Sequence, residues 1–218
     1  MILHLVTDRR RLGPDQTEAA RCACLLEQAR FAVAAEIDVI QLREGDLDGG
    51  QLATLAAAIV AVTHGTSTRV VVNDRLDVAL AAGAHGVHLR GDSFEATQVR
   101  SIVAPGFLIG RSVHSLPEVH RAGPVDYIVA GTVWATPSKG AGHPLLGPDG
   151  LAEIVAASPV PVIGIGGVDL RRAQALAAAG AAGGAAIGAF QGRGSGCLAI
   201  PLQTVTRSFR QAFVAANM

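Results

Sequence analysis

The sequence is poor in aromatic and charged residues and contains no long hydrophobic run. Of its 218 residues, 4% are aromatic and 17% are charged, with 18 Lys and Arg residues against 18 Asp and Glu residues. A balanced charge without a basic block provides no electrostatic footprint for nucleic acid or a membrane surface. No segment reaches the roughly 18 uninterrupted apolar residues that would cross a bilayer. These absences exclude nucleic acid and membranes as partners.

The first apolar run, at residues 2–6, is followed at once by charged residues and is too short for the hydrophobic region of a signal peptide. We therefore expect a cytoplasmic protein. Cysteine is also scarce, with only Cys22, Cys24 and Cys197 in the chain. Cys22 and Cys24 are two residues apart in a helical pattern, so they point in different directions and form no CxxC pair. We interpret the cysteines as buried or half-buried thiols.

Hydrophobic residues, in contrast, make up half of the chain and form short β-branched runs that alternate with Ala- and Leu-rich segments. The runs predict strands at residues 2–6, 38–43, 69–72, 86–89, 107–110, 126–130, 161–165 and 183–188. The segments between and after them predict helices at residues 17–35, 50–63, 75–82, 94–103, 116–122, 149–157, 169–179 and 203–215. Asp149 and Asp169 are the expected N-caps of two helices, and Gly83, Gly123 and Gly180 are expected to end helices.

Near-continuous apolar runs are typical of strands that are buried on both faces, and therefore of parallel strands covered by helices. Eight strand–helix units close most simply as a single (β/α)8 barrel, a TIM barrel, which we predict as one domain over residues 1–218. A doubly wound open sheet is the alternative.

In such a barrel, polar residues at the C-terminal ends of the strands form the active site, whereas those elsewhere serve stability. This rule selects the polar residues that follow six of the predicted strands: Thr7, Asp8, Gln41, Arg43, Glu44, Asn73, Asp74, His88, Arg90 through Ser93, Arg111 through His114, Thr136, Ser138 and Lys139. The long connection at residues 131–148 lies on the same face.

Two glycine-rich turns carry the clearest signal. The sequence GIGG at 164–167 follows the seventh predicted strand, and AIGAF at 186–190 follows the eighth. Glycines allow backbone N–H groups to approach phosphate oxygens, and barrels often bind phosphate after these two strands. The turns predict a phosphorylated ligand. The alternative is that the glycines only fit tight turns.

Asn73 and Asp74 offer two oxygen ligands to a hard cation such as Mg²⁺, which needs few protein ligands when a substrate supplies phosphate oxygens. Asp74 could instead cap the helix that follows it. Arg43, Arg111 and Lys139 are donors suited to a dianionic group, or they pair with nearby carboxylates such as Glu44, Asp46 and Asp92. His114 is a candidate base or a structural polar residue, and Trp134 stacks on a ring or covers the core.

Together these motifs resemble the thiamine phosphate synthase / TenI family. The resemblance runs in order through LVTD (5–8), QLRE (41–44), VNDRLDVALAAGAHGVHL (72–89), GRSVHS (110–115), TPSK (136–139), GIGG (164–167) and AIGAF (186–190). It implies one of two reactions. The synthase joins hydroxymethylpyrimidine diphosphate to hydroxyethylthiazole phosphate and releases pyrophosphate, with Mg²⁺. The TenI-type tautomerase aromatises a thiazole carboxylate phosphate without a cofactor.

For the synthase, the resemblance implies Arg43, Asp74, Ser112 and Lys139 as catalytic residues, with Asp74 as a metal ligand. Asp92, one residue before the position of the family's second metal-binding Asp, is the candidate for the other metal ligand. It implies a substrate-binding set of Gln41, Asn73, His114, Thr136, Ser138, Gly166, Gly167, Ile187 and Gly188. The partners would be the phosphorylated thiazole and the pyrimidine diphosphate, and a homo-oligomer stays open.

The sequence departs from both patterns. Gly45 stands where the synthase has a basic residue, and Ser93 stands where it has its second metal-binding Asp. Thr132 stands where the tautomerase has its acid/base histidine, although His114 or His143 could replace it. Loss of one lysine weakens a synthase without removing Mg²⁺ or Arg43, and a metal-free enzyme has little need of Asn73-Asp74. We therefore favour the synthase over the tautomerase and over a non-catalytic protein that binds thiazole or thiamine phosphate.

Overall fold

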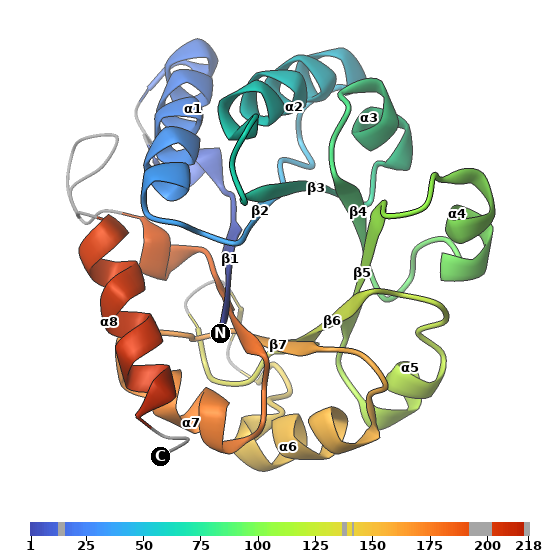
Figure 1. Cartoon of the computed structure of the whole chain (residues 1–218), viewed down its shortest axis with the longest axis vertical. Coiled ribbons are helices and arrows are strands. Elements are labelled where there is room, and N and C mark those ends of the chain that lie inside the picture. The colour runs from blue at the N-terminus through green and yellow to red at the C-terminus, as the bar shows by residue number, and fades with distance from the viewer. Residues whose placement is uncertain (13–15, 137–138, 141, 192–201, 216–218) are drawn as a thin grey trace.

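The computed structural model describes residues 1–12, 16–136, 139–140, 142–191 and 202–215. Eight parallel strands close into a barrel in the order of the chain, with β8 pairing with β1 (Figure 1). The strands are β1 (Ile2–Val6), β2 (Val39–Leu42), β3 (Arg69–Asn73), β4 (Gly86–Leu89), β5 (Leu108–Val113), β6 (Tyr127–Gly131), β7 (Val162–Ile165) and β8 (Gly183–Ala186). The predicted (β/α)8 barrel is confirmed, and the open sheet is wrong.

In the described ranges, eight α-helices surround the strands: α1 (Glu18–Ala34), α2 (Gly49–Thr63), α3 (Leu76–Ala81), α4 (Ala96–Ile102), α5 (Leu116–His120), α6 (Gly147–Ala157), α7 (Ala173–Ala178) and α8 (Leu202–Val214). The described residues also form three short 3-10 helices. The helix η1 (Arg9–Arg11) follows β1, η2 (Leu170–Arg172) follows β7, and η3 (Gly188–Phe190) follows β8. Among the described residues, no helix is long and apolar enough to cross a membrane.

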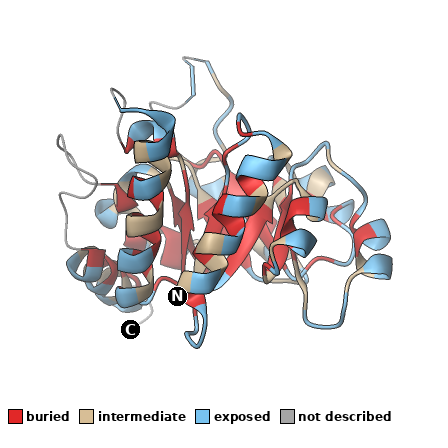
Figure 2. Ribbon diagram, turned by 90° about the horizontal axis from the view of Figure 1, so that it is seen from above, coloured by how far each residue is buried: buried red, intermediate tan, exposed pale blue. Residues whose placement is uncertain are grey.

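The strands are buried on both faces, as their apolar sequences predict (Figure 2). The larger hydrophobic cluster lies between the barrel and the helices and includes Leu3, Leu5 and Ile40. A smaller cluster, which includes Val6, Val129 and Ile163, comes from alternate strand positions. Side chains alternate along a strand, so this second cluster faces the barrel interior.

The interior also contains polar rings. His4, His88 and Tyr127 lie in contact there, with ring centroids 5.7 to 6.3 Å apart. Tyr127 fits because Gly110, its register partner on β5, has no side chain. A Cβ built on Gly110 would lie 2.1 Å from Tyr127 Cζ. The glycine therefore makes room for the only tyrosine of the chain.

The local signals for helix ends are largely confirmed. Gly83, Gly123 and Gly180 have φ of 66°, 75° and 74°, which favour glycine. Asp169 accepts a hydrogen bond from the amide of Arg172 and so caps η2. Asp149, in contrast, lies inside the first turn of α6, which begins at Gly147, so its prediction as an N-cap is wrong.

Two further predictions are corrected. Strand β5 continues to Val113, so Arg111 and Ser112 lie within the strand and not after it. Cys22 is a free thiol, but Cys24 is disulfide-bonded, so the prediction of a thiol is wrong for Cys24.

Candidate active site

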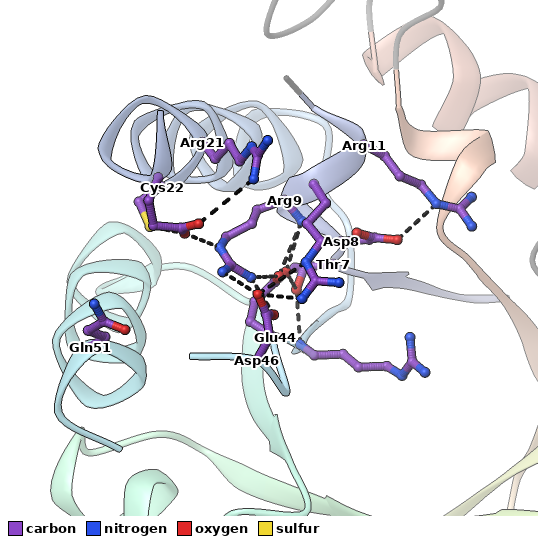
Figure 3. Close-up of polar contacts among 12 residues, drawn as sticks. Thr7, Asp8, Arg9, Arg11, Arg21, Cys22, Glu44, Asp46 and Gln51 are labelled. Carbon is purple, nitrogen blue, oxygen red and sulfur yellow. Dashed lines mark hydrogen bonds and ion pairs between the residues drawn. The ribbon is translucent and has the colours of Figure 1, made fainter. Parts of the chain in front are cut away.

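The ends of β1 and β2 are joined by a buried glutamate. The Thr7 hydroxyl donates to Glu44 Oε1 over 2.6 Å, and the backbone amide of Arg9 donates to both Glu44 oxygens (Figure 3). The Arg9 guanidinium, itself fully buried, donates to Glu44 Oε2 over 2.9 Å. Burial raises the pKa of Glu44, and these donors oppose the shift. Glu44 therefore fixes the two strand ends relative to each other.

Arg9 also binds two further carboxylates. It donates in a bidentate manner to Asp46, with both N–O distances 2.7 Å, and its Nε donates to Glu18. The hydrogen bond between Arg9 and Asp46 is the main cause of two pKa shifts: it lowers the pKa of the Asp46 carboxyl and raises the pKa of the Arg9 guanidinium. Arg10 adds a second ion pair to Asp46 at 2.7 Å. The Arg9 cluster, defined as Arg9, Glu18, Glu44 and Asp46, therefore holds the loop after β2 rigidly against η1.

This loop carries Arg43. The Arg43 amide donates to the Thr7 hydroxyl over 2.9 Å, while its side chain is exposed. In the part of the chain that the structure describes, the Arg43 guanidinium makes no ion pair, because Glu44 and Asp46 pair with Arg9 instead. The backbone of Arg43 is thus fixed while its charge remains available to a ligand.

Gln41 and Asn73, which the sequence assigned to substrate binding, contact each other directly. Gln41 is buried on β2, and its Nε2 donates to Asn73 Oδ1 at the end of β3 over 2.8 Å. The Asn73 oxygen therefore already accepts a hydrogen bond within the protein. This leaves the amide nitrogen of Asn73, a donor suited to an anionic ligand, for the site.

Asp74 has an uncommon backbone. It is one of two non-glycine residues with positive φ among those described, at 62°. Helix α3 begins at Leu76, its N-cap position is Arg75, and no side chain caps it. Asp74 is therefore not a helix cap. Its Oδ1 is buried and has no hydrogen-bond partner among the described residues, and its Oδ2 lies 3.2 Å from Arg90 Nε. A strained residue with an unpaired carboxylate oxygen at a strand end suggests a ligand.

Arg90 brings Asp74 together with Asp92, the other predicted metal ligand. Its Nε also lies 3.2 Å from Asp92 Oδ1, and the Asp92 side chain is 77% exposed. Two carboxylates around one cationic group, one with a free oxygen, fit a hard divalent cation that takes its remaining ligands from a substrate. Among the described residues, no cluster of three or more His, Cys, Asp or Glu side chains could hold a metal by itself.

Ser112 is held from inside the barrel. Its Oγ lies 2.9 Å from His88 Nε2, and His88 Nδ1 lies 3.2 Å from the Tyr127 hydroxyl. Burial lowers the pKa of His88 to about 3 and raises that of Tyr127. Both groups are therefore neutral at pH 7. His4, below them, has a pKa lowered to about 4 by burial, which the nearby Gln41 side chain opposes. Within the described residues, neither ring nitrogen of His4 makes a hydrogen bond of normal geometry.

The connection after β6 supplies the next predicted residues. The amide of Lys139 donates to the Thr136 carbonyl over 3.1 Å, and the Lys139 side chain is exposed. Ser138 lies outside the described residues. Thr132 is buried, and its hydroxyl lies 3.1 Å from His143 Nε2. The structure thus brings His143 to Thr132, the position that departs from the tautomerase pattern.

The turn after β7 is closely packed. Gly166 and Gly167 have φ of 97° and 64°. A Cβ on Gly166 would lie 2.4 Å from Thr132 Cγ2, and one on Gly167 would lie 2.6 Å from Arg172 Nη1. Arg172 donates to the Gly167 carbonyl and lies over the Trp134 ring, 5.3 Å from its centroid. Trp134 therefore stacks on a protein cation.

The turn after β8 is more open. Ile187 is partly buried against the interior cluster, and Gly188 begins η3. No atom lies within 4 Å of a Cβ built on Gly188, so there is open space beside its backbone. The first amides of a helix have no partner within it. This turn therefore offers backbone donors to a ligand at the same end of the barrel as the turn after β7.

Two other candidate residues, a predicted donor and a predicted base, have structural partners. Arg111 is buried, and its Nη2 donates over 3.4 Å to the carbonyls of Gly91 and Ser93. It supports the loop that carries Asp92. The His114 ring contacts the Gly131 carbonyl through Nδ1 while remaining exposed.

A family profile described as thiamine monophosphate synthase matches residues 4–190. The chain belongs to this family. A thiamine-phosphate synthase from Methanoculleus marisnigri is 39% identical over 217 residues, covering 99% of this chain and 96% of that relative. One from Azorhizobium caulinodans is 39% identical over 190 residues, with 86% of each chain covered.

A solved structure is also similar to this chain over nearly its whole length. The thiamine phosphate pyrophosphorylase from Pyrococcus furiosus has a TM-score of 0.78 and 28% identity, and the similarity covers 99% of this chain and 96% of that one. The family resemblance and the prediction of an enzyme are confirmed. Sequence reasoning did not identify Arg9, His4, Tyr127 or Arg172 as parts of this end of the barrel and its interior. One signal was present: three consecutive arginines that begin three residues after the end of a buried strand.

Proposed function

We propose that this protein is a thiamine phosphate synthase, which joins hydroxymethylpyrimidine diphosphate to hydroxyethylthiazole phosphate. In the reaction, the bond between the pyrimidine methylene carbon and the diphosphate oxygen breaks, and its electron pair leaves with pyrophosphate. The thiazole nitrogen then donates its electron pair to the methylene carbon. The protein needs no nucleophile of its own, because it accelerates the reaction by holding two substrates together and stabilising a leaving anion.

The observation that carries this choice within the family is Asp74. Its left-handed backbone, its lack of a capping role and its unpaired oxygen have no use in a metal-free reaction. We propose that Asp74 and Asp92 hold Mg²⁺, which would neutralise charge on the diphosphate. The names of relatives that match 86% to 99% of the chain support the same reaction.

The protein's own residues divide between the two substrates. Arg43, Lys139, Ser112 and the amide of Asn73 would bind the diphosphate as donors, with Gln41 positioning Asn73. The amides of Gly166, Gly167, Ile187 and Gly188 would bind the thiazole phosphate. Thr136, Ser138 and His114 would line the thiazole side. The Arg9 cluster keeps Arg43 in place without touching either substrate.

Asp74→Asn tests this proposal. Asparagine tolerates the left-handed backbone, so the variant should fold, but it removes the charge. We expect synthase turnover to fall by about 10²- to 10³-fold, the loss typical for one group that stabilises transition-state charge. Asp77→Asn is the matched control, because Asp77 is exposed and pairs only with Arg75 nearby. Equal activity of Asp74→Asn and wild type, or full activity in EDTA, would refute the metal assignment.

The TenI-type tautomerase is the second candidate, and one observation favours it. His143 Nε2 lies 3.1 Å from the hydroxyl of Thr132, where that enzyme has its acid/base histidine. If His143 provides the missing proton shuttle, the protein should aromatise the thiazole carboxylate phosphate without metal. His143→Gln should then abolish this activity while leaving thiamine phosphate formation intact. Absence of aromatisation by the wild-type protein would eliminate this candidate.

A further inference from the structure

The interior of the barrel contains a hydrogen-bonded chain that leads to the active-site end. Tyr127 on β6, His88 on β4 and Ser112 on β5 follow one another, with distances of 3.2 Å and 2.9 Å between their polar atoms. Tyr127 and His88 are almost completely buried, whereas Ser112 is half-buried at the end of its strand. Only one end of this chain is therefore open to a ligand.

The direction of the hydrogen bonds follows from counting donors. A neutral imidazole has one N–H donor and one acceptor nitrogen. If His88 carried its proton on Nδ1, that group would donate to Tyr127, and the buried phenol proton would have no acceptor among the described residues. The neighbouring His4 ring is not that acceptor, because neither of its nitrogens is within hydrogen-bond geometry of the Tyr127 hydroxyl.

The opposite arrangement gives every donor of the Tyr127–His88–Ser112 chain an acceptor within the chain or at its open end. The Tyr127 hydroxyl donates to His88 Nδ1, and the proton on Nε2 donates to Ser112 Oγ. The Ser112 hydroxyl, already an acceptor, then has its own proton left for a group outside the chain. Leaving a buried donor unpaired costs free energy, so this tautomer is preferred.

We propose that Tyr127 and His88 are positioning residues that fix the Ser112 hydroxyl as a hydrogen-bond donor to the anionic leaving group of the substrate. A free serine hydroxyl can rotate and can donate or accept, whereas this one is restricted to donating. A fixed donor suits an oxygen whose negative charge grows as the bond breaks, since it requires no reorganisation. The inference rests on the proposed function, which supplies the diphosphate.

Gly110 is part of the same device. It is the register partner of Tyr127, and its missing side chain lets the phenol lie against β5, two residues before Ser112. Glycine at this position, tyrosine on β6 and histidine on β4 are each unremarkable in the sequence. Only their contacts in the structure show that the three residues together position the Ser112 hydroxyl.

A double-mutant cycle with Tyr127→Phe and Ser112→Ala tests the proposal. Tyr127→Phe removes only the hydroxyl, so the ring still packs. We expect Ser112→Ala to lower kcat by about 10- to 100-fold and Tyr127→Phe to lower it by about 3- to 10-fold, with KM nearly unchanged. In the Ser112→Ala background, Tyr127→Phe should change kcat less than about 2-fold, because the chain then has nothing to position.

Thr68→Val is the matched control. Its buried hydroxyl donates to the Ile37 carbonyl over 2.8 Å before the start of β3, at the other end of the barrel. Its loss should lower the melting temperature without changing kcat. A second readout is independent of activity. Nitrogen-15 NMR of the imidazole, assigned by comparison with His88→Gln, should show the proton of His88 on Nε2 in wild type.

The outcomes separate the two proposals. A wild-type protein without synthase activity refutes the proposed function, and the NMR tautomer then still decides the direction of the chain. An active wild type with additive effects of the two substitutions, an unaffected Ser112→Ala, or a proton on Nδ1 would overturn the positioning role. Non-additive losses in kcat together with a proton on Nε2 are the expected result.

Discussion

Replacing Gly45 with lysine should raise the rate of thiamine phosphate formation, because it adds a cation beside the departing diphosphate. The backbone permits the change. Gly45 is not among the glycines with positive φ, and no atom lies within 4 Å of a Cβ built on it. Glycine is therefore not required at this position for conformational reasons.

The new charge should also remain available to the substrate. The carboxylates on either side are occupied: Glu44 accepts from Thr7 and Arg9, and Asp46 accepts from Arg9 and Arg10. An exposed cation about 4 Å from an anion contributes about 1 kcal/mol in water and more where solvent is partly excluded. We take about 1 kcal/mol, which corresponds to roughly a 5-fold increase in kcat.

The assay is steady-state release of pyrophosphate by wild type, Gly45→Lys and the neutral control Gly45→Gln, each with a melting curve. Both variants should melt at or slightly above the wild-type temperature, because replacing glycine restricts the unfolded chain. Only the lysine variant should be faster. Equal rates for Lys and Gln, in proteins that melt normally, would show that no diphosphate charge develops beside residue 45.

Three further predictions concern the barrel and its turns. His4 has a pKa of about 4 when folded against 6.5 in its unperturbed state, so its contribution to stability is present above pH 6.5 and is lost as the pH falls toward 4. Measured by urea denaturation, His4→Leu should reduce the slope of unfolding free energy against pH in this window by up to about 1.4 kcal/mol per pH unit, and an unchanged slope would contradict the assignment. Gly167→Ala should destabilise by about 1–3 kcal/mol because its Cβ meets Arg172 and Trp134, whereas Gly188→Ala should keep its melting temperature and raise the KM for thiazole phosphate. Arg9→Met should cost about 3–5 kcal/mol in chemical denaturation because it leaves Glu44 buried and unpaired, and a loss below 1 kcal/mol would show that Glu44 is solvated.

The strands were predictable because burial on both faces leaves a plain pattern of apolar runs. Even β8, with its weak sequence GGAA, was placed correctly, since a closed barrel requires an eighth strand. The extension of β5 was not predictable from the same pattern. Arg111 and Ser112 resemble loop residues in sequence, but Ser112 faces the polar interior and Arg111 supports a loop.

The placement of candidate site residues was predictable where residue type and strand end coincide, as at Asp74 and the glycine turns, whereas their roles stay predictions. It was not predictable where the partner comes from elsewhere in the chain. Nothing in three consecutive arginines indicates that Arg9 turns inward while Arg10 and Arg11 stay at the surface. Tyr127 likewise resembles an ordinary core residue until Gly110 opposite it is known.

The most direct test of the central claim is the overall reaction. Purified wild-type protein is mixed with hydroxymethylpyrimidine diphosphate, hydroxyethylthiazole phosphate and Mg²⁺, and thiamine phosphate and pyrophosphate are both quantified. We predict equal amounts of the two products and no product when EDTA replaces Mg²⁺. Binding of both substrates without formation of either product, or turnover that is unaffected by EDTA, would contradict the account.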